Sequence, residues 1–146
     1  MGNRVTLKFT NEFKHLYAHW NGGPESFVAA IKFAINELGA TKNNLGKHVC
    51  EIYKSSFSSK YDLQDLQEPI CPGDDNGDWE INWYEGDKFP TITKLNDGDF
   101  DVEEFKPGIY SLESLLGRLK HHEYWANEDN IVDHIRKKHF QEISPC

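Results

Sequence analysis

The residues best suited to chemistry lie in one short stretch, His19-Trp20-Asn21-Gly22-Gly23-Pro24, which precedes a helical pattern. The His19 imidazole could act as a general base or contact a ligand, because this side chain titrates near neutral pH. The glycines could present backbone N–H groups to an anion at the start of the helix. Alternatively, the stretch is a structural corner in which the glycines turn the chain and Pro24 begins the helix. The candidate ligand-binding residues are His19, Asn21, Gly22 and Gly23.

Common phosphate, metal and nucleophile motifs are absent from the sequence. The glycine spacing matches neither a P-loop nor a dinucleotide-binding fingerprint, and no Gly-x-Ser-x-Gly elbow occurs. His134 and His139 are five residues apart, which differs from the fixed geometry of zinc-binding helices. Cys50 and Cys71 belong to no Cys-x-x-Cys pair. We therefore expect no metal and no cofactor, and an enzymatic activity stays open.

Acidic residues gather in two turns, 74–78 (DDNGD) and 96–104 (NDGDFDVEE). Neither fits an EF-hand loop, because counting back from the glycine to the first loop position reaches Pro72 or Thr93. Both are interpreted as solvated turns. The second could also form an acidic face for a basic partner. The candidate partner-binding residues are Asp97, Asp99, Asp101, Glu103 and Glu104.

Composition narrows the classes of function. The 146 residues suit a single domain, 1–146, and carry a formal net charge of −8. A general nucleic-acid binder usually carries a basic field, so direct nucleic-acid binding is not expected. No segment has the apolar length of a membrane span, and the first residues do not resemble a signal peptide. Together with three cysteines that form no disulfide framework, these features predict a cytoplasmic protein.

Periodicity predicts the elements that would position these residues. Alternating patterns predict strands over 5–10, 15–20, 79–85 and 90–95, and an edge strand over 100–105. Helical spacing predicts helices over 24–38 and 43–58, with two more in the part of the chain after Ser111. In the second strand, alternation predicts that Trp20 faces the core and His19 faces solvent or a cleft. The long connection 59–77 could be functional. The predicted fold is α+β, an antiparallel sheet of four to five strands in two hairpins with helices packed on one face.

The segment from Val5 to about Leu38 resembles a group of small bacterial and prophage proteins. Their shared feature is a hairpin that ends in His-Trp-Asp-Gly-aromatic-Pro before a helix. In this chain Asn21 replaces the acid and Gly23 replaces the aromatic residue. The amide of Asn21 can neither act as a base nor carry charge. The resemblance implies an origin in a phage or mobile element.

Two functions of different classes follow from these observations. The first is an acidic protein-binding module of phage type that inhibits or redirects a host or defence protein with a basic surface in the bacterial cytoplasm. The alternative is a small ligand-binding protein or enzyme, with its site at the corner 19–24 and the connection 59–77.

Overall fold

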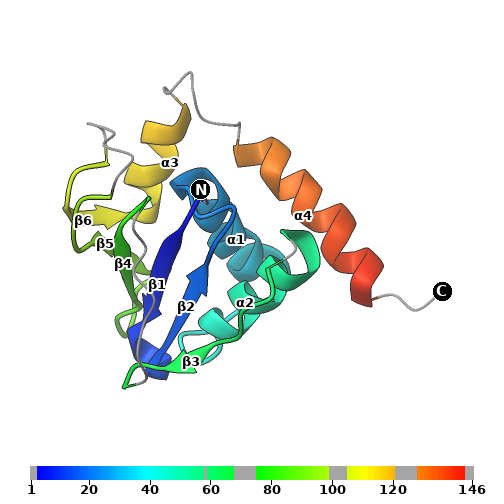
Figure 1. Cartoon of the computed structure of the whole chain (residues 1–146), viewed down its shortest axis with the longest axis horizontal. Helices are drawn as coiled ribbons and strands as arrows, with labels where there is room; N and C mark the ends of the chain where they lie inside the picture. The colour runs from blue at the N-terminus through cyan, green and yellow to red at the C-terminus, as the bar shows by residue number, and fades with distance from the viewer. Residues whose placement is uncertain (1–2, 58, 68–74, 99–104, 121–127, 144–146) are drawn as a thin grey trace.

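The computed structural model describes residues 3–57, 59–67, 75–98, 105–120 and 128–143. The chain has an α+β fold, as predicted, with one sheet and helices on one face of it (Figure 1). No helix in the described ranges is long and apolar enough to cross a membrane.

Both predicted hairpins are confirmed. Strand β1 (Val5–Phe9) pairs antiparallel with β2 (Lys14–Ala18), and β4 (Asp78–Asn82) pairs antiparallel with β5 (Thr91–Lys94). The inward side chains alternate along the strands and include Leu7, Leu16, Ile81 and Ile92, all of them buried. The large apolar side chains lie on this one face, which explains why the alternation in the sequence was informative, although Thr6 and His15 on the opposite face are buried too.

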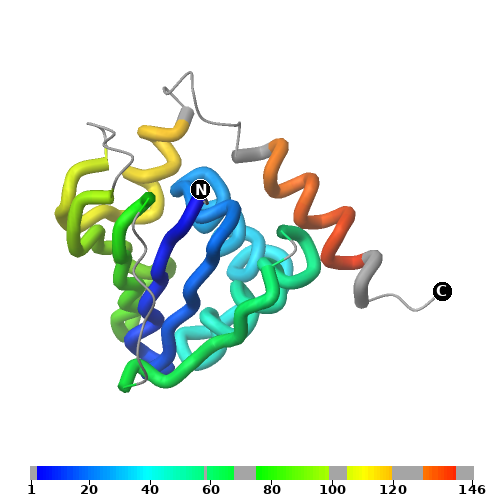
Figure 2. The backbone as a smooth tube through the Cα atoms, in the orientation of Figure 1, coloured from blue at the N-terminus to red at the C-terminus, as the bar shows by residue number. Residues whose placement is uncertain are grey.

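The predicted sheet was wrong in its detail. It has six strands in the order β3-β2-β1-β4-β5-β6, and its central pair, β1 and β4, is parallel. Two short edge strands, β3 (Gln64–Asp65) and β6 (Gly108–Ser111), complete it. The chain leaves the sheet after β2 and passes through helices before it returns (Figure 2). This crossover allows β4 to run alongside β1 in the same direction. Of the predicted edge strand 100–105, residues 100–104 lie outside the described part of the chain.

Local sequence signals define the helix ends. Helix α1 (Pro24–Glu37) begins with its proline, as predicted, and Gly39 follows its end with a φ of 66°. Helix α2 (Leu45–Ser56) begins where the Glu12 carboxylate accepts a 2.6 Å hydrogen bond from the Gly46 N–H. Helix α3 (Leu112–Lys120) is capped by Ser111, whose Oγ accepts a 3.0 Å bond from Ser114 N–H. Helix α4 (Glu128–Ile143) ends the described chain.

The core lies between the sheet and the helices. Phe27 of α1 meets Trp79 of β4 at a ring-centroid distance of 4.9 Å, and both side chains are fully buried. Helix α4 packs against both α1 and α2 and buries Val132 and Ile135. The junction between β2 and α1 is therefore surrounded by α2 and α4, which gives the corner 19–24 neighbours that are distant in the sequence.

Candidate functional site

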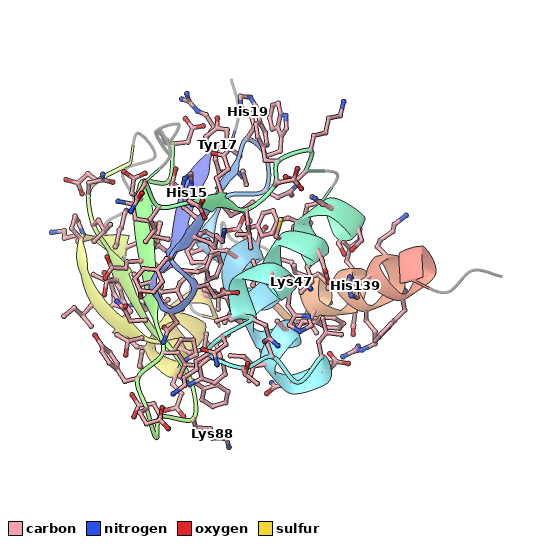
Figure 3. All side chains as sticks on the ribbon, turned by 90° about the horizontal axis from the view of Figure 1, so that it is seen from below. His15, Tyr17, His19, Lys47, Lys88 and His139 are labelled. Atoms are coloured by element: carbon pink, nitrogen blue, oxygen red, sulfur yellow. The ribbon has the colours of Figure 1, made fainter. Side chains whose placement is uncertain are left out.

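Strand β2 carries two polar aromatic side chains, His15 and Tyr17, and a third, His19, follows just beyond its end (Figure 3). Alternation places His15 and Tyr17 on the sheet face opposite to the buried Leu16 and Ala18. His15 is itself buried, with 1% exposure. The Tyr17 hydroxyl lies 3.0 Å from His19 Nδ1, and this contact fixes the orientation of the His19 ring.

The prediction that Trp20 is a core residue was wrong. Strand β2 ends at Ala18, so His19 and Trp20 follow it in a bend where the two-residue alternation no longer applies. Ala18 is the last inward residue, and 57% of Trp20 is exposed. The Trp20 ring meets the His19 ring edge-to-face at 5.2 Å. His19 and Trp20 thus form one aromatic pair at the surface.

Asn21, Gly22 and Gly23 form the tight turn between β2 and α1. Asn21 has a φ of 58°, and its carbonyl accepts a 2.9 Å hydrogen bond from the Tyr53 hydroxyl. A Cβ on Gly22 would lie 2.5 Å from the Asn3 carbonyl oxygen, and one on Gly23 would collide with the Glu25 carboxylate. The two glycines therefore permit close approach of the chain to itself, whereas His19 and Asn21 each face a hollow.

The first hollow, here called the aromatic cleft, has a volume of about 330 Å³ and is lined by His19, Trp20, Ser59, Lys60 and Tyr61. It brings the candidate residue His19 together with the beginning of the connection 59–77. Tyr61 is 43% exposed, and its ring meets Tyr17 edge-to-face at 5.0 Å. Two exposed aromatic rings, an ammonium and an imidazole therefore converge on one concavity.

The second hollow, here called the acid cavity, lies on the other side of the corner and has a volume of about 450 Å³. Its described lining comes from the corner, α1, α2 and α4: Asn21, Glu25, Ser26, Ser56, Phe57, Asn130, Ile131 and His134. Burial raises the pKa of Glu25 to about 7, although the Glu25 backbone N–H donates to the carboxylate and opposes that rise. Glu25 Oε2 is buried and has no hydrogen-bond partner in the described part of the chain.

A histidine from α4 lies opposite this carboxyl group. His134 Nε2 is 3.0 Å from the Ser56 carbonyl oxygen, so Nε2–H donates and a neutral ring carries its lone pair on Nδ1. The ring stacks on Phe57 with an interplanar angle of 8°. The cavity therefore holds a buried acid and a fixed imidazole within one mixed lining, which also includes Phe57 and Ile131.

The two acidic turns differ in their outcome. The interpretation of 74–78 as a solvated turn was wrong at Asp75, which is 2% exposed and pairs with Arg4 Nε at 2.9 Å. In the second turn Asp97 is exposed. The other four candidate partner-binding residues lie outside the described residues: Asp99, Asp101, Glu103 and Glu104.

Reasoning from the sequence missed several residues that line or support these hollows. Tyr17, which contacts the His19 ring, could have been found, because the pattern His-x-Tyr in a strand places His15 and Tyr17 on one face. Lys60 and Tyr61 carried no signal, since the path of the connection depends on tertiary packing. Glu25 and His134 were also missed, because 109 positions separate them in the chain and only the docking of α4 unites them.

Comparisons with protein-family models, with curated protein sequences and with solved structures find no match to this chain. The function is therefore inferred from the geometry of the two hollows.

Proposed function

We propose that the chain is a ligand-binding protein whose aromatic cleft holds a small anionic molecule with a planar ring. The observation that carries this proposal is the pair of exposed rings, Trp20 and Tyr61, beside a hollow that also contains Lys60 and His19. Large aromatic side chains contribute strongly to the free energy of binding when a ligand covers them and removes their surface from water. Two of them held beside one concavity form a platform for a flat ligand.

The hydrogen-bond donors of the aromatic cleft favour an anionic ligand. Lys60 supplies an ammonium group, and the contact of His19 Nδ1 with Tyr17 leaves Nε2 as the nitrogen that a ligand can reach. Both groups can donate hydrogen bonds to a carboxylate or phosphate. The described lining contains no carboxylate that would repel an anion. Aromatic carboxylates and nucleoside monophosphates combine the required ring and charge.

The test is binding of two probes, adenosine monophosphate and benzoate, measured by calorimetry. Trp20→Ala should weaken binding of the preferred probe about tenfold or more, since stacking on an aromatic side chain contributes about 1–3 kcal/mol. Lys60→Met should weaken it as well and reduce its dependence on salt. The matched control is Tyr84→Ala, which removes another exposed ring, 59% exposed, from outside the cleft.

Thermal unfolding of the same variants separates binding from folding. Trp20→Ala should leave the unfolding temperature close to that of the wild type, because the ring is largely in solvent. Equal affinities in the wild type and Trp20→Ala would contradict the proposal, as would a wild type that binds neither probe.

A second candidate function is the acidic protein-binding module, with a basic host or defence protein as its partner. The net charge of −8 and the exposed position of Asp97 favour it. Asp97→Lys should then reduce recovery of a stoichiometric partner from a bacterial lysate, whereas Trp20→Ala should not. Recovery that depends on neither Asp97 nor added salt would exclude this function.

A further inference from the structure

The acid cavity is separate from the aromatic cleft and has the opposite chemistry. Its described lining includes no Lys or Arg, and its single carboxyl group belongs to Glu25. The other polar groups are the amides of Asn21 and Asn130, the hydroxyls of Ser26 and Ser56 and the imidazole of His134. The amides and hydroxyls can all accept hydrogen bonds. The described lining therefore offers several acceptors and contains no ammonium or guanidinium group.

The Glu25 carboxyl group has an oxygen, Oε2, that lacks a hydrogen-bond donor among the described residues. Glu25 lies in the first turn of α1, where its side chain folds back over Gly23. Oε2 is shielded from water, and no described group of the chain donates to it. A buried polar atom of this kind is costly unless it is hydrogen-bonded. Oε2 is shielded from the hollow as well as from bulk water, so a donor in the cavity would remove that cost once the Glu25 carboxyl group turns this oxygen toward it.

Groups on the neighbouring elements do not compete for this role. Tyr53 of α2 directs its hydroxyl to the Asn21 carbonyl, and its pKa is raised by burial and by Glu25. His134 of α4 donates through Nε2 to the Ser56 carbonyl and stacks on Phe57. The Tyr53 hydroxyl and the His134 Nε2–H are therefore already used in hydrogen bonds to backbone carbonyls.

We propose that the acid cavity binds a small organic cation, a primary ammonium or a guanidinium, whose N–H groups donate to the Glu25 carboxylate and to the surrounding amide and hydroxyl oxygens. A desolvated carboxylate and a cation satisfy each other with charge-assisted hydrogen bonds, which are the stronger kind. The volume of about 450 Å³ leaves room for a small organic ligand. The excess of 24 acidic over 16 basic residues attracts cations toward the protein.

Binding of a cation is coupled to loss of a proton. With the pKa of Glu25 at about 7, this residue is mostly protonated at pH 6 and mostly ionised at pH 8. A ligand that requires the ionised form should therefore bind about tenfold more tightly at the higher pH. Butylammonium, the probe chosen here, stays protonated throughout this range.

The experiment is a titration of the ¹⁵N-labelled chain with butylammonium chloride at constant ionic strength, with butan-1-ol as the uncharged probe. We expect saturable shifts of the Ser26 and Asn130 amide signals with the cation, and none with the alcohol. Glu25→Gln should abolish them and the rise with pH, while keeping the shape of the side chain. Glu51→Gln removes the same charge from an exposed position on α2 and should bind as the wild type does.

A second variant protects the test against misfolding. Asn130 is exposed at the mouth of the cavity, so Asn130→Phe should block the probe while Glu25 stays in place. No saturable shift in the wild type at pH 8 would overturn the proposal. Unchanged binding in Glu25→Gln would overturn it too, as would a tenfold pH dependence that survives in that variant, because a group other than Glu25 would then be its origin. None of these outcomes depends on ligands of the aromatic cleft.

Discussion

Glu25 makes the stability of the folded chain depend on pH. Its pKa is about 7 in the folded chain, against an ordinary value of 4.5. The folded state therefore holds a proton that the unfolded state has lost, and stability falls as pH rises from about 4.5 to 7. Relative to the wild type, Glu25→Gln should gain about 3 kcal/mol of unfolding free energy across this range. Urea unfolding of both proteins at several pH values measures the difference, and a difference that does not change with pH would contradict the argument.

Single residues were predictable where the pattern around them was continuous. Leu7 and Ile81 lie within regular alternation and are buried as expected. Trp20 lies two positions beyond the end of its strand, where the pattern no longer fixes the direction of a side chain. A carboxylate in the first turn of a helix, such as Glu25, is explained by the helix dipole alone, so nothing local in the sequence indicated its burial. Its burial arises from α2 and α4, which no local pattern describes.

The junction between β2 and α1 depends on the absence of a side chain at position 22. A Cβ on Gly22 would lie 2.8 Å from Arg4 C and 2.8 Å from Val5 N, and these are backbone atoms that cannot rotate away. Gly22→Ala should therefore destabilise the chain by about 1–3 kcal/mol. Gly117→Ala in α3 is the matched control, because its Cβ would meet nothing within 4 Å. That change should be neutral or stabilising by up to about 1 kcal/mol. Thermal unfolding of both variants tests the contrast, and equal effects would disprove the packing role of Gly22.

Elements with strong local signals were predicted, and those that depend on distant pairing were not. Helix α1 shows its proline start and its glycine stop in the sequence, and the structure confirms both. Its first half is buried all round, from Ser26 to Ile31, and not on one face alone. The parallel pairing of β1 with β4 left no local trace, because alternation shows that a strand has one buried face but not which strand lies beside it. Strand β6 is four residues long and only Tyr110 in it is buried, so its pattern was too short to recognise.

Across the whole molecule, polar contacts join the start of β1 to the approach to β4. The Asp75 carboxylate accepts hydrogen bonds from Arg4 N at 2.9 Å and from Arg4 Nη2 at 3.1 Å. Asn76 N–H donates to the Arg4 carbonyl at 3.0 Å. These bonds close a loop of 71 residues at the end of the central parallel pair. They align the two halves of the sheet.

Asp75→Asn tests this connection through its pH dependence. Hydrogen bonds to Arg4 lower the pKa of Asp75 below its ordinary value of 3.8, so the ionised form stabilises the folded chain above that pH. At neutral pH the substitution should reduce the free energy of unfolding by about 2 kcal/mol. The deficit should disappear as acid protonates the wild-type carboxyl, because a protonated Asp75 and an asparagine are alike in charge. The two substitutions differ in sign. As pH rises, Glu25→Gln becomes more stable than the wild type, whereas Asp75→Asn becomes less stable than the wild type. Unfolding free energies of the two variants, measured in the same buffers over a range of pH, test this argument. Opposite trends with pH would exclude a general electrostatic effect. Parallel trends would show that net charge, and not these two contacts, governs the stability of the chain.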